Sequence, residues 1–114
     1  MPYIDAKLSV KLEENQKDDL QKKLSAAVSS AFSKPNAYIM ANIEDSKSLF
    51  MGDRKLDKGA YISVSLLGSA SKPACQSLTR DICSILTSEY GLEGSGIYIT
   101  YHPTELWGWN ASMF

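Results

Sequence analysis

Pro2 stands directly behind the initiator Met1 and opens an alternating, strand-like segment, Tyr3–Leu8. A small second residue favours removal of the methionine, which would leave proline with a free secondary α-amine. Such amines titrate near pH ~7.7–8, and burial in an apolar pocket or a neighbouring cation lowers that pKa further. A base that titrates near neutral pH suits proton abstraction next to a carbonyl group. The alternative is that proline merely tolerates the first position of a strand.

The composition is typical of one globular domain. The chain has 114 residues, of which 44% are hydrophobic and 22% charged, with a formal net charge of −1. This near-neutral charge gives no reason to expect nucleic acid or a membrane surface as a partner. No apolar run approaches the ~18–20 residues of a membrane span, and no basic segment precedes a signal-type stretch. We therefore expect a cytoplasmic protein, with export by a route that the sequence does not encode as the alternative.

The residue types that usually hold metals or cofactors are sparse. His102 is the only histidine, and the two cysteines, Cys75 and Cys83, do not form a Cys-x-x-Cys pair. Both cysteines lie in one predicted helix about two turns, or ~12 Å, apart, which exceeds the ~7 Å limit between the Cα atoms of a disulfide. We expect buried structural thiols, no metal site and no cofactor.

Hydrophobic periodicity predicts four strands and two helices in the order β-α-β, connector, β-α-β. Tyr38 and Tyr98 would each be the second residue of a closing strand, so residues of about 1–45 and 59–103 look like versions of one unit within a single domain, 1–114. Right-handed crossovers then predict an α/β two-layer sandwich, a four-stranded sheet with two antiparallel helices on one face. The predicted strands are Tyr3–Leu8, Ala37–Ile43, Ala60–Leu67 and Ile97–Tyr101, and the predicted helices are Glu13–Phe32 and Pro73–Tyr90.

Strand alternation predicts one uniformly apolar sheet face, which should meet the helices, and a second face rich in tyrosine. Two helices cannot cover both faces, so the second face is either solvated or covered by other subunits. Tyrosine has an apolar body and a polar tip and therefore suits a subunit interface or the wall of a pocket. The tyrosines predicted on this face are Tyr3, Tyr38, Tyr61 and Tyr98.

Three stretches make the chain resemble the macrophage migration inhibitory factor family of the tautomerase superfamily. They are Met1-Pro2-Tyr3-Ile4, then Ser33-Lys34-Pro35-Asn36-Ala37-Tyr38-Ile39-Met40, and Ile97-Tyr98-Ile99-Thr100 leading to Trp107-Gly108-Trp109-Asn110-Ala111-Ser112-Met113-Phe114. The resemblance implies a homotrimer whose sheets form a barrel, with active sites between subunits. It also implies keto–enol tautomerisation of phenylpyruvate-like and dopachrome-like substrates. Animal members additionally act as cytokines that are secreted without a signal peptide.

The resemblance also assigns roles to individual positions. Pro2 matches the catalytic proline, Lys34 the lysine that binds the substrate carboxylate, and Leu67 a residue whose backbone amide holds the substrate. Tyr98 matches a pocket tyrosine that a neighbouring subunit contributes. Thr100 stands where the vertebrate protein has asparagine, which puts substrate preference in doubt. The positions expected to line the pocket are Tyr38, Thr100, Trp109 and Phe114.

Some of these assignments have purely structural alternatives. Lys34 could simply complement the dipole at the end of the first helix. Trp107 and Trp109 could serve in interface packing, alone or together with a role in the pocket, since we expect Leu106–Phe114 to cross a subunit boundary. The alternative function is a secreted cytokine or protein-interaction module with little catalysis. The expected partners are a small aromatic α-keto acid or enol, a homotrimer and, for a secreted protein, a cell-surface receptor.

Overall fold

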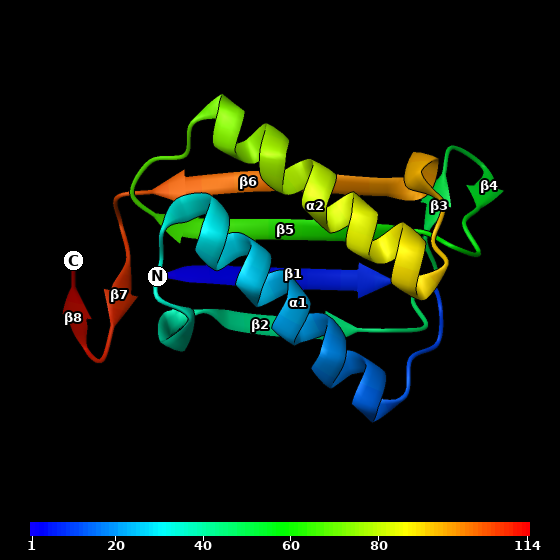
Figure 1. Ribbon diagram of the computed structural model, residues 1–114, viewed down its shortest axis with the longest axis horizontal. Coiled ribbons are helices and arrows are strands. Elements are labelled where there is room, and N and C mark those ends of the chain that lie inside the picture. Colours follow the sequence, from blue (N-terminus) through cyan, green and yellow to red (C-terminus); the bar gives the residue numbers. More distant parts are fainter.

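The computed structural model describes residues 1–114 as two layers, a four-stranded sheet and a pair of helices (Figure 1). The strand order is β2-β1-β5-β6, in which β1 and β5 are antiparallel and each outer strand is parallel to its inner neighbour. This confirms the predicted two-layer sandwich made of two β-α-β units. The strands are β1 (Pro2–Leu8), β2 (Met40–Glu44), β5 (Ala60–Leu67) and β6 (Ile97–Thr104).

The two antiparallel helices, α1 (Glu14–Phe32) and α2 (Lys72–Tyr90), begin and end at local signals. A capping box between Glu13 and Gln16 starts α1, and the Ser71 hydroxyl accepts the Ala74 amide at 3.2 Å at the start of α2. The left-handed residue Gly91 ends α2 directly after Tyr90, the last residue of the predicted helix. Neither helix is apolar enough over a sufficient length to span a membrane.

The core lies between the helices and one face of the sheet. In β1 and β5 every second residue is buried, which is the alternation that the sequence predicts. The helices contribute residues at helical spacing from their inner stripes. The fully buried core side chains include Ile4, Leu8, Ile62, Val64 and Leu66 from the sheet, and Leu20, Leu24, Val28, Leu78, Ile82 and Leu86 from the helices.

The strand predicted over Ala37–Ile43 is wrong in its first half. Residues Asn36–Tyr38 form the 3₁₀ turn η1, in which the Tyr38 amide donates to the Pro35 carbonyl at 3.1 Å. The chain must reverse here between the end of α1 and the start of β2, and a tight turn does this in few residues. Tyr38 is therefore not on the open sheet face and does not correspond to Tyr98, which lies within β6.

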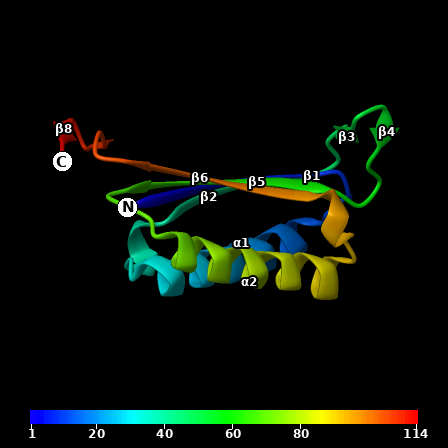
Figure 2. The same ribbon diagram turned by 90° about the horizontal axis from the view of Figure 1, so that it is seen from above.

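The second sheet face carries no helix, as predicted (Figure 2). Tyr3 and Tyr61 are partly exposed there, and Tyr98 is 61% exposed. Two short hairpins project toward this side from opposite ends of the sheet. They are β3 (Phe50–Met51) with β4 (Arg54–Lys55), and β7 (Gly108–Trp109) with β8 (Ser112–Met113). A second 3₁₀ turn, η2 (Gly94–Gly96), precedes β6.

Candidate active site

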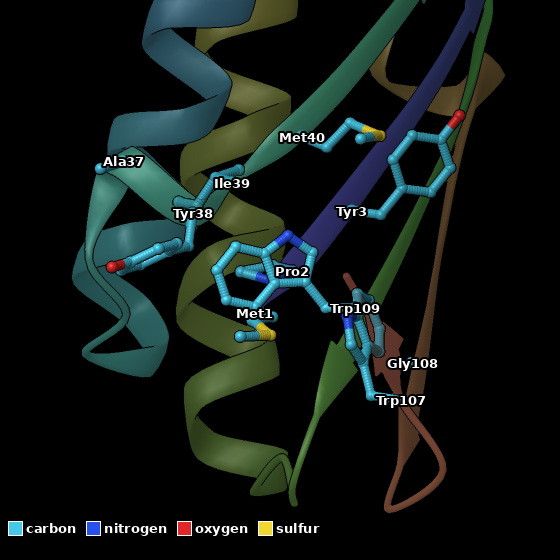
Figure 3. A pocket seen from close by; sticks show the side chains of 10 residues that line it. All are labelled: Met1, Pro2, Tyr3, Ala37, Tyr38, Ile39, Met40, Trp107, Gly108 and Trp109. Carbon is cyan, nitrogen blue, oxygen red and sulfur yellow. The ribbon is translucent and has the colours of Figure 1, made fainter. Parts of the chain in front are cut away.

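A cavity of about 690 Å³ opens where β1 begins, and Pro2 forms part of its wall (Figure 3). Pro2 is fully buried. Three segments that are far apart in the sequence build the wall, which is mostly apolar: the amino terminus, the η1 turn with the start of β2, and the β7 region. The lining residues are Met1, Pro2, Tyr3, Ala37, Tyr38, Ile39, Met40, Trp107, Gly108 and Trp109.

Lys34 reaches the amino-terminal region from the end of α1. Ser33 ends this helix in the left-handed region (φ 53°), and the Ser29 hydroxyl donates to the Lys34 carbonyl at 2.5 Å. The Lys34 ammonium then donates to the carbonyl of Leu67 in β5 at 3.2 Å. The side chain thus extends to β5 and forms no hydrogen bond to a carbonyl of α1.

The charge of Lys34 has no acidic partner. Among the partly buried lysines, Lys7, Lys17 and Lys23 each lie within 4.0 Å of a carboxylate oxygen, whereas Lys34 does not. A shielded cation normally finds a counter-charge, because its hydration has been reduced. Lys34 therefore offers an uncompensated positive charge beside the cavity, where an anionic ligand could neutralise it.

Leu67 connects this cation to the amino terminus. Its amide donates to the Met1 carbonyl at 3.2 Å, while its own carbonyl accepts from the Lys34 ammonium. The surroundings also act on the terminal amine: burial, and secondarily the positive charge of Lys34, lower the pKa of the Met1 α-amine below its ordinary value. An amine at this end of β1 is thereby shifted toward its neutral, basic form.

Aromatic rings form one side of the site. Tyr38 and Trp109 meet edge to face with ring centroids 6.0 Å apart, and Phe114 stacks on Trp109, also at 6.0 Å. Trp109 lies in the β7–β8 hairpin and Phe114 directly follows it, and this end of the chain is held by the Phe114 amide, which donates to the Trp107 carbonyl at 3.0 Å. Each of the three rings is about half exposed, so a planar ligand ring can reach them.

The model of the family described as macrophage migration inhibitory factor (MIF) matches residues 1–114. The chain belongs to the MIF family. It is 30% identical to the macrophage migration inhibitory factor of Xenopus tropicalis over 100 residues, which are 85% of each chain. Its fold matches a MIF crystal structure from Leishmania major with a TM-score of 0.88 at 23% identity, over 100% of this chain and 97% of that one.

More distant solved structures share the fold. One was solved after inactivation by 2-oxo-3-pentynoate and matches with a TM-score of 0.78 at 14% identity, over 90% of this chain and 85% of that one. Another is a fused 4-OT protein described as a symmetric trimer, with a TM-score of 0.74 at 16% identity and the same two coverages. At such identities the likeness concerns the fold alone.

Two residues that the MIF resemblance assigns to the pocket lie elsewhere in the protomer. Tyr98 pairs with Tyr61, which in turn pairs with Lys7, at the opposite end of β1 from Pro2. The Thr100 hydroxyl contacts the Tyr61 hydroxyl at 2.7 Å and Nε2 of His102 at 2.9 Å on the open sheet face. A single protomer of this MIF-family chain therefore does not bring Tyr98 or Thr100 to Pro2.

The cavity also contains residues that we did not predict as site residues. Tyr3, Met40 and Trp107 line it, whereas Phe114 touches it only through Trp109. Tyr3 follows Pro2 directly and pairs with Met40 across the parallel strands, so the β1–β2 register was the signal that could have found this pair. The sequence pattern predicts both strands but not the register in which they pair.

The two cysteines take no part in this site. Cys75 and Cys83 are free and partly buried on α2. Burial raises the pKa of both thiols, so they stay protonated and poorly nucleophilic near neutral pH. No three side chains of the His, Cys, Asp and Glu types gather closely enough to hold a metal ion.

Proposed function

We propose that this protein is a keto–enol tautomerase of small aromatic α-keto acids, in which Pro2 is the base after Met1 has been removed. The observation that carries the proposal is the uncompensated charge of Lys34 beside the buried Pro2 and its mostly apolar cavity. A carboxylate would pair with Lys34 as a compact point charge. The rings of Tyr38 and Trp109 would contact the aromatic ring of the same ligand.

The reaction needs one group that both accepts and returns a proton. In the keto-to-enol direction, the neutral Pro2 nitrogen takes a proton from the carbon next to the carbonyl. The electrons of that C–H bond form the carbon–carbon double bond, and the carbonyl π electrons move to oxygen. The Pro2 ammonium then gives its proton to this oxygen, which completes the enol and restores the amine.

Removal of Met1 would prepare the site in two ways. It converts the Pro2 nitrogen from an amide, which is not basic, into an amine. It also frees the Leu67 amide, which donates to the Met1 carbonyl while the methionine is present. That freed donor lies next to Lys34 and could bind an oxygen of the substrate, in agreement with the role that the MIF resemblance gives to Leu67.

We further propose that Tyr98 and Thr100 reach the pocket of an adjacent subunit in a homotrimer. The open sheet face, the exposed Tyr98 and the projecting hairpin with Trp109 and Phe114 offer surface for such contacts. The fused 4-OT neighbour, described as a symmetric trimer, supports the same assembly. Sedimentation should give about three times the chain mass of 12.6 kDa, and a stable monomer at micromolar concentration would refute the interface.

The decisive experiment compares three proteins in a phenylpyruvate tautomerase assay: Met-free protein, a Pro2→Gly variant, and protein with one alanine inserted between Met1 and Pro2. Mass spectrometry establishes each amino terminus. The insertion keeps the proline nitrogen acylated, so we expect it to lose almost all activity. Pro2→Gly should lose most of it, because a primary amine replaces the secondary one. Full activity of the insertion protein would exclude Pro2 as the base.

A second candidate function is that of a MIF-like signalling or interaction module, and the name of its Xenopus relative favours it. Such a module would keep the trimer and its exposed surface. It would act either in the cytoplasm or, after secretion without a signal peptide, on a receptor. The Pro2→Gly variant separates the two functions, because it should remove catalysis and leave assembly and any receptor binding intact.

A further inference from the structure

We propose that Gly68 is a positioning residue: its backbone conformation turns the Leu67 carbonyl toward Lys34 and so holds the Lys34 ammonium at the site. This inference rests on the proposed function, because it concerns how the carboxylate-binding cation is kept in place. Gly68 does not line the cavity, and nothing in the MIF resemblance used above assigns it a role.

The peptide group between Leu67 and Gly68 is bonded at both ends. Its carbonyl accepts from the Lys34 ammonium at 3.2 Å, and its N–H, which belongs to Gly68, donates to the Thr104 carbonyl at 2.9 Å. The preceding N–H, that of Leu67, faces the Met1 carbonyl. The peptide group before Leu67 thus faces the amino terminus, and the one after it faces the lysine on one side and the end of β6 on the other.

Only glycine adopts this backbone conformation readily. Gly68 has φ +105°, a region in which a side chain strains the backbone. A Cβ atom at this position would lie 3.9 Å from the Lys34 nitrogen, so space is not the obstacle. Any other residue would tend to relax toward negative φ, which rotates the peptide group and turns the Leu67 carbonyl away from Lys34.

This matters because the Leu67 carbonyl is the only partner of the Lys34 ammonium among the hydrogen bonds and ion pairs of the protomer. A neutral carbonyl orients the ammonium without neutralising it, whereas a carboxylate would cancel the charge that the substrate needs. Without this acceptor, the lysine side chain is free to sample many rotamers, and the positive charge is no longer held near the terminal amine.

The test compares Gly68→Ala with Gly91→Ala in Met-free protein. Gly91 also has positive φ (+71°), a Cβ atom there would have no neighbour within 4 Å, and the residue lies at the end of α2, away from the cavity. Each variant is assayed with phenylpyruvate and with its methyl ester, which lacks the carboxylate. The pKa of the Pro2 amine is measured separately by ¹⁵N NMR, which does not require activity.

We expect Gly68→Ala to raise KM for phenylpyruvate about tenfold, which corresponds to the loss of one hydrogen bond to a charged group. KM for the ester should change little. The pKa of the Pro2 amine should rise as the lysine moves away. Adding Gly68→Ala to a Lys34→Ala background should change neither quantity further, because the glycine acts through the lysine. Gly91→Ala should lower stability only.

The proposal is overturned if Gly68→Ala leaves both the KM ratio and the amine pKa unchanged, if Gly91→Ala changes them equally, or if the double variant is additive. If Gly68→Ala does not fold, Gly68→Asn carries the test, because asparagine tolerates positive φ better than alanine but favours values of about +57°, so it still turns the peptide group partway from its orientation at +105°. KM ratios between those of the wild type and Lys34→Ala then support the proposal, and unchanged ratios refute it. A wild type without activity whose amine pKa still responds to Gly68→Ala refutes the proposed function but not the positioning role.

Discussion

The two ends of the sheet have similar backbone hydrogen bonds between the β1 and β5 segments, but they differ in how tightly the surrounding residues pack. At one end the Leu67 amide donates to the Met1 carbonyl at 3.2 Å, and at the other the Ser9 amide donates to the Gly59 carbonyl at 3.0 Å. The first end opens into the cavity around Pro2. The second end is closed at Gly59, where a Cβ atom would lie 2.9 Å from Cβ of Leu56.

The helix ends show the same contrast. Ser33 and Gly91 both leave their helices in the left-handed region, with φ values of 53° and 71°. The next residue is Lys34 in the first unit, where it binds the Leu67 carbonyl, and Leu92 in the second, where it is 4% exposed in the core. Similar backbone turns therefore serve a candidate active site at one end and hydrophobic packing at the other, and the side-chain type decides which.

Lys34→Leu, which makes the open end resemble the closed one, should have the largest effect. Without the ammonium, kcat/KM for phenylpyruvate should fall on the order of 10- to 100-fold, because a charge-assisted hydrogen bond is lost. The same charge lowers the pKa of the terminal amine, so its loss should raise that pKa and move the pH–rate profile to higher pH. Steady-state kinetics across pH measures both quantities.

The free energy of unfolding should change little in Lys34→Leu, because no carboxylate is left unpaired. Lys22→Leu is the matched control, since Lys22 is an exposed lysine of α1. An unchanged pH profile in Lys34→Leu, or an equal loss of activity in Lys22→Leu, would contradict the role of Lys34 as the substrate cation.

Gly59→Ala should damage the closed end without affecting the site. The new methyl group would lie 2.9 Å from Leu56 and 3.0 Å from the Gly96 carbonyl, which is too close for normal contact. Such overpacking costs about 1–3 kcal/mol, measurable by urea denaturation at fixed protein concentration. Gly94→Ala is the control, because nothing lies within 4 Å of its Cβ position. A change in KM in Gly59→Ala would show that the two ends are coupled.

Asp45→Asn should change how acid acts on the closed end. Asp45 accepts the Leu12 amide at 3.0 Å and pairs with Lys17 at 3.1 Å, and these two contacts hold the pKa of its carboxyl well below the usual range. A depressed pKa in the folded state stabilises the protein above the unfolded pKa of about 3.9, and this stabilisation is lost as pH falls below it.

The free energy of unfolding of the wild type should therefore decline more steeply below about pH 4 than that of Asp45→Asn. Denaturation curves at a series of pH values measure the two slopes. Parallel slopes would mean that the carboxylate contributes nothing to stability in acid. Activity at neutral pH should be the same in both proteins, because Asp45 follows β2 at the end away from Pro2.

Ala111→Gly should have the smallest effect, at the hairpin that supports the open end. Asn110 and Ala111 form the turn with φ of 51° and 65°, and glycine suits the second position of such a turn better than alanine. The gain should be about 0.5–1 kcal/mol, seen as slower hydrogen exchange of the Phe114 amide. Faster exchange would contradict this account of the turn.

Local signals in the sequence predicted much of the fold. The bounds of α1 and α2 are correct within one residue, because caps such as Ser71 and Gly91 act on their immediate neighbours. The η1 turn was missed because Ala37-Tyr38-Ile39-Met40 has the composition of a strand, and a 3₁₀ turn in it depends on where the chain must go after Pro35.

The sequence by itself determined the two β-α-β units, the apolar face of the sheet and the candidate roles of Pro2 and Lys34. The units and the apolar face follow from side-chain periodicity, the role of Pro2 from the chemistry of a free secondary amine together with the MIF resemblance, and the role of Lys34 from that resemblance. Only the tertiary structure decided that Lys34 lacks a carboxylate partner, that the Leu67 carbonyl holds it, and that Tyr98 lies at the far end of the sheet. Charge compensation and strand register depend on which distant segments meet, and no local pattern specifies that.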